Sequence, residues 1–296
     1  MPMPRTIAEY LGQLRAALRG ADPALIQDAL YDAEDHLRSE VAENPGKSEA
    51  EVLGRIANSY GAPEDVAAIY VDKEQLVQHA LRTPPLRPRG SALGHFFGVA
   101  ADPRAYAALF YMLLSLATGI FYFTWAVTGI SLSIGLMVVI IGIPFAVLFF
   151  GTVRVLALVE GRLVEVMLGE RMPRRPLYSD RDQPLRERIT NMFTDPRTWS
   201  TLLYMALMLP LGIAYFTIAI TGLSVSISLA ISPIIKATTG WGIININDQH
   251  YAPPLWATPF TFVIGVVLLV ALLHLARGVG HLQGALAKHL LVKSAA

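Results

Sequence analysis

Long stretches without a charged residue constrain the fold of this chain more than any other feature. Residues 105–153 form 49 consecutive positions without Asp, Glu, Lys or Arg, and residues 198–235 form 38 more. A helix of about 20 apolar residues crosses the hydrocarbon core of a bilayer. The first stretch is therefore long enough for two crossings, with a tight turn expected at residues 128–133. Only 16% of the 296 residues are charged, against about 25% in an ordinary soluble domain, so we expect an integral membrane protein.

The chain contains an internal duplication. The segment DPRAYAALFYMLLSLATGIFYFTWAVTGISLSIGL begins at Asp102, and DPRTWSTLLYMALMLPLGIAYFTIAITGLSVSISL begins at Asp195, with 20 of 35 aligned positions identical. Two repeats, at about 102–176 and 195–291, each predict two crossings. The predicted crossings are residues 106–127, 134–156, 199–220 and 258–276. Because each repeat has an even number of crossings, both copies enter the membrane in the same direction, which predicts a pseudo-two-fold axis along the membrane normal.

The first 80 residues predict a small acidic helical domain, with 14 Asp and Glu against 7 Lys and Arg. Helix signals are dense there: a helix at about residues 6–19, Asp22 as N-cap before Pro23, and a stop at residues 44–46. A capping box at Ser48 and Glu51, a closing Gly61 and a start at Pro63 complete four helices. The fold class predicted for the whole chain is all-α: this small cytoplasmic domain (1–80) and a four-helix transmembrane unit (96–291) built from two tandem two-helix repeats.

Arginines set the expected orientation. Nine arginines lie in residues 154–197, and three more lie in a proline-rich linker at 81–95, whereas the loops on the other side contain only Lys236. By the positive-inside rule, both termini and the central loop are expected to be cytoplasmic. One alternative stays open, since residues 222–235 could span the membrane, re-enter it or lie at its outer surface.

Two resemblances to known families cover nearly the whole chain. The segments YLGQLRAALRG, ALYDAEDHLRSEV and SEAEVLGRIANSYGAPEDVAAIY resemble the HAAS helical signalling domain of bacterial membrane proteins. The segment TGISLSIGLMVVIIGIPFAVLFFGTVRVLALVEGRLVEVMLG is similar to the four-helix sensor domain that precedes a histidine kinase in many actinobacterial proteins. The resemblances imply signal relay to a cytosolic protein partner such as a PadR-like transcription regulator. The same resemblances imply a bacterial inner membrane. Only residues 288–296 follow the last expected helix, so we expect no kinase here and an output through the N-terminal domain, the arginine-rich loop or a partner protein.

Two groups of residues are candidates for sensing. An outward loop in the second repeat carries polar and aromatic side chains, which could bind a ligand or form an ordinary polar loop: Trp241, Asn245, Asn247, Asp248, His250, Tyr251 and Trp256. Hydroxyl groups recur at the expected turns of both repeats, where they could cap helix ends or bind a ligand: Thr128, Ser131, Ser133, Thr221, Ser224 and Ser226. We expect Arg154, Glu160 and His274 to anchor helix ends at the lipid headgroups.

Enzyme chemistry has little support in the sequence. There is no glycine-rich phosphate loop, nucleophile elbow or His-Glu-x-x-His motif, and no cysteine, so we expect no catalytic residue, metal or cofactor. An acidic soluble domain also argues against direct nucleic-acid binding. The leading interpretation is a membrane signalling protein that contacts the lipid bilayer and a cytosolic partner. The alternative is a small transporter or lipid-binding channel without a signalling role, while the stimulus and a homodimer stay open.

Overall fold

The computed structural model describes residues 4–81, 91–138, 142–175, 187, 190, 193–239, 244–246, 249–251 and 254–292. Its regular structure is helical apart from one short hairpin, which confirms the expected all-α class. The chain divides into two compact units. One contains Met1–Arg82, Thr128–Tyr204 and Gly284–Ala296, and the other contains Thr83–Val127 and Met205–Gln283. Each unit is described on its own.

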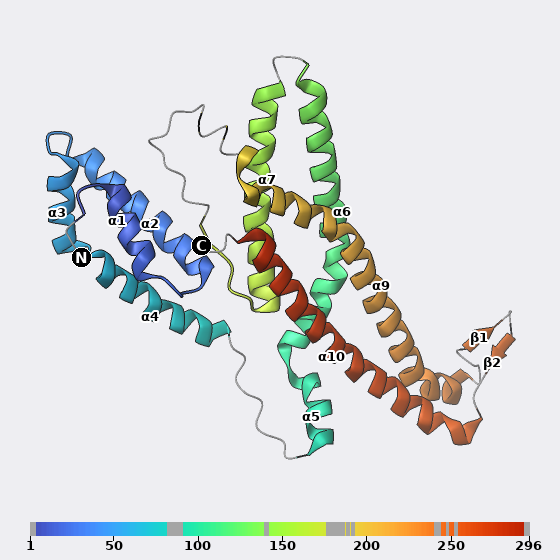
Figure 1. The fold of residues 1–296 in the computed structure, drawn as a ribbon. Coiled ribbons are helices and arrows are strands. Elements are labelled where there is room, and N and C mark those ends of the chain that lie inside the picture. Colours follow the sequence, from blue (N-terminus) through green and yellow to red (C-terminus); the bar gives the residue numbers. More distant parts are fainter. Residues whose placement is uncertain are drawn as a thin grey trace. The chain divides into compact units, whose positions relative to one another are not determined.

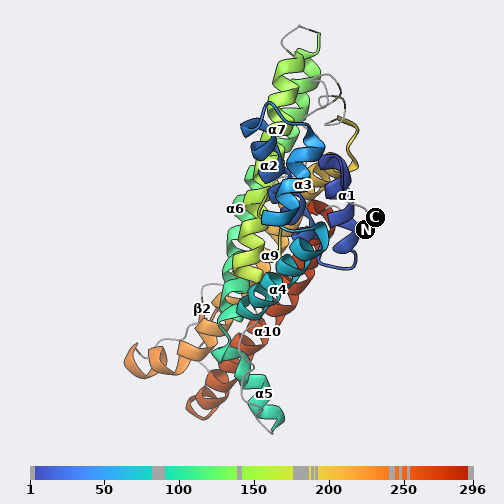
Figure 2. The same cartoon turned by 90° about the vertical axis from the view of Figure 1, so that its left-hand side faces the viewer.

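The N-terminal segment of the first unit folds into the four helices that its capping residues predict (Figures 1 and 2). They are α1 (Ile7–Ala17), α2 (Pro23–Glu43), α3 (Glu49–Ser59) and α4 (Pro63–Leu81). The Asp22 carboxylate accepts the Ala24 N–H at the start of α2, and Ser48 with Glu51 forms the reciprocal capping box of α3. Gly61 has a φ of 110°, so it supplies the left-handed conformation that lets the chain turn before α4.

The core of these four helices is the apolar stripe of α2 packed against α1, α3 and α4. Leu25, Leu30 and Leu37 are at most 4% exposed, and Leu14 of α1 and Val52 of α3 meet them in the same cluster. The Tyr10 hydroxyl donates to the Gly61 carbonyl at 2.9 Å, which ties α1 to the α3–α4 turn. Burial of this stripe explains why a short acidic segment folds: the apolar residues lie on one face and the carboxylates largely on the other.

Four long helices follow, and each is long and apolar enough to cross a membrane. They are α6 (Pro103–Leu136), α7 (Gly142–Leu168), α9 (Pro196–Thr239) and α10 (Thr258–Leu291). The expected turn at residues 128–133 is wrong, because α6 continues through it to Leu136 and α7 begins only at Gly142. In the second repeat residues 222–235 are likewise part of α9, despite Pro233. At 34 residues α6 is about 50 Å long, well beyond the hydrocarbon thickness of a bilayer.

In the second unit the duplicated helices meet at equivalent residues. A Cβ on Gly119 of α6 would lie 2.3 Å from the Met208 carbonyl oxygen of α9. A Cβ on Gly212 of α9 would lie 2.3 Å from the Ser115 carbonyl oxygen of α6. In the repeat alignment Gly119 corresponds to Gly212 and Ser115 to Met208. The contact is therefore reciprocal, as a two-fold relation between the repeats requires, and glycine allows the two backbones to touch.

Short elements connect the long helices of the second unit. The helix α5 (Ala92–Gly98) begins inside the linker expected at 81–95 and leads through η1 (Val99–Ala101) to α6. Between α9 and α10 lies a two-stranded antiparallel hairpin, β1 (Ile244–Ile246) and β2 (Gln249–Tyr251), with Asn245 opposite His250 (Figure 1). A 3-10 turn, η2 (Leu255–Ala257), precedes α10.

Candidate functional site

The candidate site begins where α7 ends. Gly169 has a φ of 76°, and its N–H donates to the Glu165 carbonyl, so the chain leaves the helix in a left-handed turn. The next residues, 170–175, form a segment without helix or strand that contains Arg171, Arg174 and Arg175. We call this the post-α7 segment. It lies against α2 and α4 and is bound to them through its arginines and its backbone.

Arg171 joins three helices. Its Nη2 donates to Asp28 Oδ2 of α2 at 2.9 Å, and its Nε donates to Glu74 Oε2 of α4 at 3.1 Å. Its Nη1 lies 3.7 Å from Glu165 Oε1 of α7. The arginine and all three carboxylates are less than 10% exposed. We call Asp28, Glu74, Glu165, Arg171 and Arg174 the Arg171 junction. Charge-assisted hydrogen bonds of this kind are stronger than neutral ones and specify geometry.

Backbone groups complete the junction. The N–H groups of Arg174 and Arg175 both donate to Asp28 Oδ1 at 2.8 Å. The Arg174 Nη2 donates to Glu165 Oε1 at 2.8 Å, so the segment also folds back onto α7. Gln27 of α2 donates from Nε2 to the Arg175 carbonyl at 2.6 Å. Asp28 thus receives three donors, and the post-α7 segment is bound along its length to α2.

Burial and pairing act in opposite directions on the ionisation of the junction. Burial raises the pKa of the Asp28 carboxyl, against the hydrogen bonds from the Arg175 and Arg174 backbone and from Arg171. Burial alone lowers the pKa of Arg171, but its hydrogen bond to Glu74 and the charge of Asp28 outweigh this and raise the pKa overall. The guanidinium therefore stays charged, and its charge keeps the surrounding carboxylates paired. The residues of the Arg171 junction include no nucleophile paired with a base. The junction can hold α2, α4 and α7 together, or release them when its ion pairs break.

Further contacts of the first unit tie the ends of α9 and α10 to the same region. The Arg197 Nη2 of α9 donates to Gln27 Oε1 at 2.8 Å, and its Nε donates to the Leu291 carbonyl of α10 at 2.9 Å. Lys288 of α10 pairs with Asp22 of α2. Glu160, which we expected at the headgroups, is instead 2% exposed and accepts the Tyr204 hydroxyl at 2.7 Å. A carboxylate with a buried donor has no need to reach water, which explains the difference.

Comparison with known proteins places the membrane helices in a family. A profile of the family described as "Putative sensor" matches residues 111–291, which is more than half of the chain. The chain belongs to this family. The match runs from the first turns of α6 to the end of α10 and includes the post-α7 segment. No curated protein and no solved structure matches this chain.

The hydroxyl groups expected at turns lie instead within the sensor-family helices, three in α6 and three in α9. Only the last of each set is buried: Ser133 is 6% exposed and Ser226 is 2% exposed. The Ser133 hydroxyl donates to the Gly129 carbonyl one turn back, which satisfies it inside the helix. Thr128, Ser131, Thr221 and Ser224 are exposed. The structure therefore does not gather the six hydroxyls into a site.

The residues of the candidate sensing loop fall into three groups. Trp241, Asn247 and Asp248 lie outside the described residues. Asn245, His250 and Tyr251 lie in the backbone of β1 and β2, where Asn245 and His250 are paired across the hairpin. Trp256 lies in η2 and is 74% exposed. A sensing role for this loop stays a hypothesis.

Sequence reasoning missed the Arg171 junction. We interpreted the arginines after α7 as a topology signal and the carboxylates of residues 1–80 only as the charge of an acidic domain, and each interpretation is ordinary when taken alone. The signal that could have paired them is charge complementarity. The first 80 residues carry twice as many acidic as basic residues, and the segment RMPRRP, residues 171–176, carries three arginines at a helix exit. Nothing in the sequence, however, specifies which carboxylate receives which arginine.

Proposed function

We propose that this member of the sensor family is a signalling protein in which the membrane helices pass a stimulus to the N-terminal domain through the Arg171 junction. One observation carries the proposal: the segment that leaves α7 inserts Arg171 between Asp28 of α2 and Glu74 of α4. A displacement of the end of α7 must then either move α2 and α4 or break buried charge-assisted bonds. The resemblance of residues 1–80 to HAAS signalling domains supports the same role.

The proposed switch has two states of the junction. When it is closed, Asp28, Glu74 and Asp32 are occupied by arginines of the post-α7 segment. When it opens, the same acidic helix faces become available to a cytosolic protein such as a PadR-like regulator. A stimulus shifts this equilibrium only if it binds the two states with different affinity. In this proposal both termini are cytoplasmic in a bacterial inner membrane, and the chain has no catalytic role and does not contact nucleic acid directly.

The test uses the full-length protein in its native membrane with two matched substitutions. Arg171→Gln removes the buried guanidinium of the junction, while Arg162→Gln removes an arginine that pairs with the same Glu165 but is 53% exposed. Each protein is solubilised gently and purified, and the associated proteins are measured by quantitative mass spectrometry. We expect the amount of at least one cytosolic protein to change several-fold with Arg171→Gln and to match wild type with Arg162→Gln.

Equal recovery of every associated protein from all three forms would contradict the relay. The alternative function, a small transporter or lipid-binding channel, is tested separately. A protein lacking residues 1–91 is reconstituted in liposomes, and this alternative predicts that it carries a solute or lipid across the membrane. Transport by that truncated form would mean that the membrane helices work without the N-terminal domain. Absence of transport, together with a change in partner recovery, supports signalling.

A further inference from the structure

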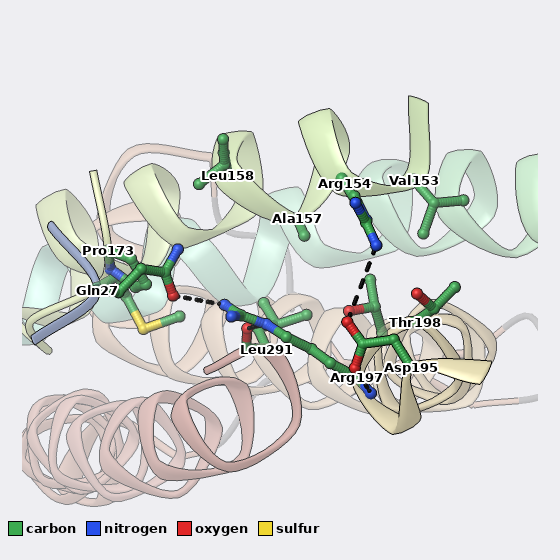
Figure 3. Close-up of a pocket in the computed structure, with 12 residues that line it drawn as sticks. Gln27, Val153, Arg154, Ala157, Leu158, Pro173, Asp195, Arg197, Thr198 and Leu291 are labelled. Atoms are coloured by element: carbon green, nitrogen blue, oxygen red, sulfur yellow. Dashed lines mark hydrogen bonds and ion pairs between the residues drawn. The ribbon is translucent and has the colours of Figure 1, made fainter. Parts of the chain in front are cut away.

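A pocket beside the junction has features that the relay does not use. It lies in the first unit among α7, the post-α7 segment, the start of α9 and the end of α10 (Figure 3). It contains about 630 Å³ of space, part of it open to solvent. Its polar lining comes from Gln27, Arg154, Asp195, Arg197, Thr198 and Thr201. We call it the α7–α9 pocket.

Two polar atoms that line this pocket are buried without a partner among the described residues. One is Nη1 of Arg197, whose other two guanidinium nitrogens donate to Gln27 and to the Leu291 carbonyl. The other is the hydroxyl oxygen Oγ1 of Thr198, a residue that is only 3% exposed. Buried polar groups in native proteins are nearly always hydrogen-bonded, so both atoms need a partner that the described residues do not supply.

The charge of the pocket specifies that partner as an anion. Arg154 and Arg197 contribute two guanidinium groups against one carboxylate, Asp195. Asp195 is already engaged, because its Oδ1 caps α9 by accepting the Arg197 N–H at 3.0 Å. The Arg154 Nη2 is 3.9 Å from Asp195 Oδ2, beyond hydrogen-bond distance. The pocket also adjoins the N-terminus of a 44-residue helix, which favours negative charge.

The first repeat provides an internal comparison. Asp102 corresponds to Asp195 and likewise accepts a backbone N–H, from Arg104. There, however, the cation is close, with the Arg277 Nη1 at 3.2 Å from Asp102 Oδ2. The position equivalent to Thr198 is Ala105, which has no hydroxyl. The unpaired donors of the second repeat are therefore not required by the shared helix architecture.

From these observations we infer that the α7–α9 pocket binds a phosphate-type oxyanion, held by Arg197 Nη1, the Thr198 hydroxyl and the Arg154 guanidinium. The oxyanion is either the phosphate of a lipid headgroup or free phosphate. Arginine suits this role because its planar fork of donors matches the oxygen atoms of a phosphate group. The inference concerns binding alone and stands whether or not the relay is correct. Arg197, which would hold the anion, also donates to Gln27 of α2.

The experiment has two arms with the full-length protein purified in dodecyl maltoside, a detergent without a phosphate group. In the first, the protein is titrated with inorganic phosphate by calorimetry. In the second, phosphatidylglycerol is added to the micelles, and bound phosphatidylglycerol is counted by native mass spectrometry. We expect saturable binding in at least one arm. Binding in the first identifies free phosphate as the source, and binding in the second identifies the headgroup.

Two substitutions connect the binding to the pocket. Thr198→Val removes the hydroxyl while keeping the shape of the side chain, and Arg154→Gln removes one charge at a partly exposed position. Each is expected to weaken binding at least tenfold, whereas Thr194→Ala, an exposed threonine nearby, leaves it unchanged. Circular dichroism checks that all variants remain helical. Absence of saturable binding in both arms, or wild-type binding by Thr198→Val and Arg154→Gln, would overturn the inference.

Discussion

At the scale of single residues, the reciprocal glycine contact makes a sharp prediction. Gly119→Ala and Gly212→Ala would each drive a methyl group into a backbone carbonyl of the other helix, which cannot rotate away as a side chain can. Overpacking of this kind costs about 1–3 kcal/mol, so both variants should melt at lower temperature in detergent micelles. Gly135→Ala, in the same helix as Gly119 but with open space around it, should be neutral or stabilising. Equal melting of all three variants would rule out the close approach.

Predictions for single residues were right where the signal acts locally, and wrong where a membrane environment changes what a residue does to a helix. Asp22, Ser48 and Gly61 act within a few residues of themselves, and the structure confirms each as a helix boundary. Thr128 and Ser133, in contrast, look like turn residues in a soluble chain. Inside a membrane helix a hydroxyl can bond a carbonyl one turn back, as Ser133 does to Gly129, so serine and threonine do not end the helix.

At the scale of secondary-structure elements, the duplication predicted four long helices but not their ends. A crossing needs about 20 residues, whereas α6 and α9 contain 34 and 44. The extra turns are apolar too, so no change of composition marks where they stop.

The Arg171 junction could not be predicted for another reason: Arg171 and Asp28 are 143 residues apart. Pairing over such a distance depends on how the elements pack, which one sequence does not specify.

The junction predicts that one arginine stabilises the N-terminal helices far more than its neighbour. Arg171→Gln leaves the buried carboxylates of Asp28 and Glu74 without their cation, and breaking a buried pair costs about 3–5 kcal/mol. Amide hydrogens of α2 and α4 should then exchange at least tenfold faster by mass spectrometry of the full-length protein. Arg162→Gln removes a guanidinium that is 53% exposed, and Glu165 keeps its hydrogen bond from Arg174, so this change should cost no more than about 1 kcal/mol and leave exchange unchanged. Similar exchange in the two variants would mean that the junction does not hold these helices.

At the scale of the whole molecule, an even number of crossings and the distribution of arginines together predict where each end of the chain lies. Four crossings would place the N-terminal domain and the carboxyl terminus on the same side, and the positive-inside rule predicts that this side is cytoplasmic. The η2 segment between α9 and α10 is then expected to face outward. The chain has no cysteine, so single cysteines can report each location without background.

Labelling with a membrane-impermeant maleimide tests this arrangement. Ser39→Cys lies on an exposed position of α2, Trp256→Cys replaces a side chain that is 74% exposed, and a third variant carries a cysteine appended to the carboxyl terminus. In intact cells only Trp256→Cys should react, and the other two should react once the membrane is permeabilised. Reaction of Ser39→Cys and the appended cysteine alone would reverse the orientation. Reaction of only one of those two would mean an odd number of crossings, because the ends of a chain share a side only when the crossings are even.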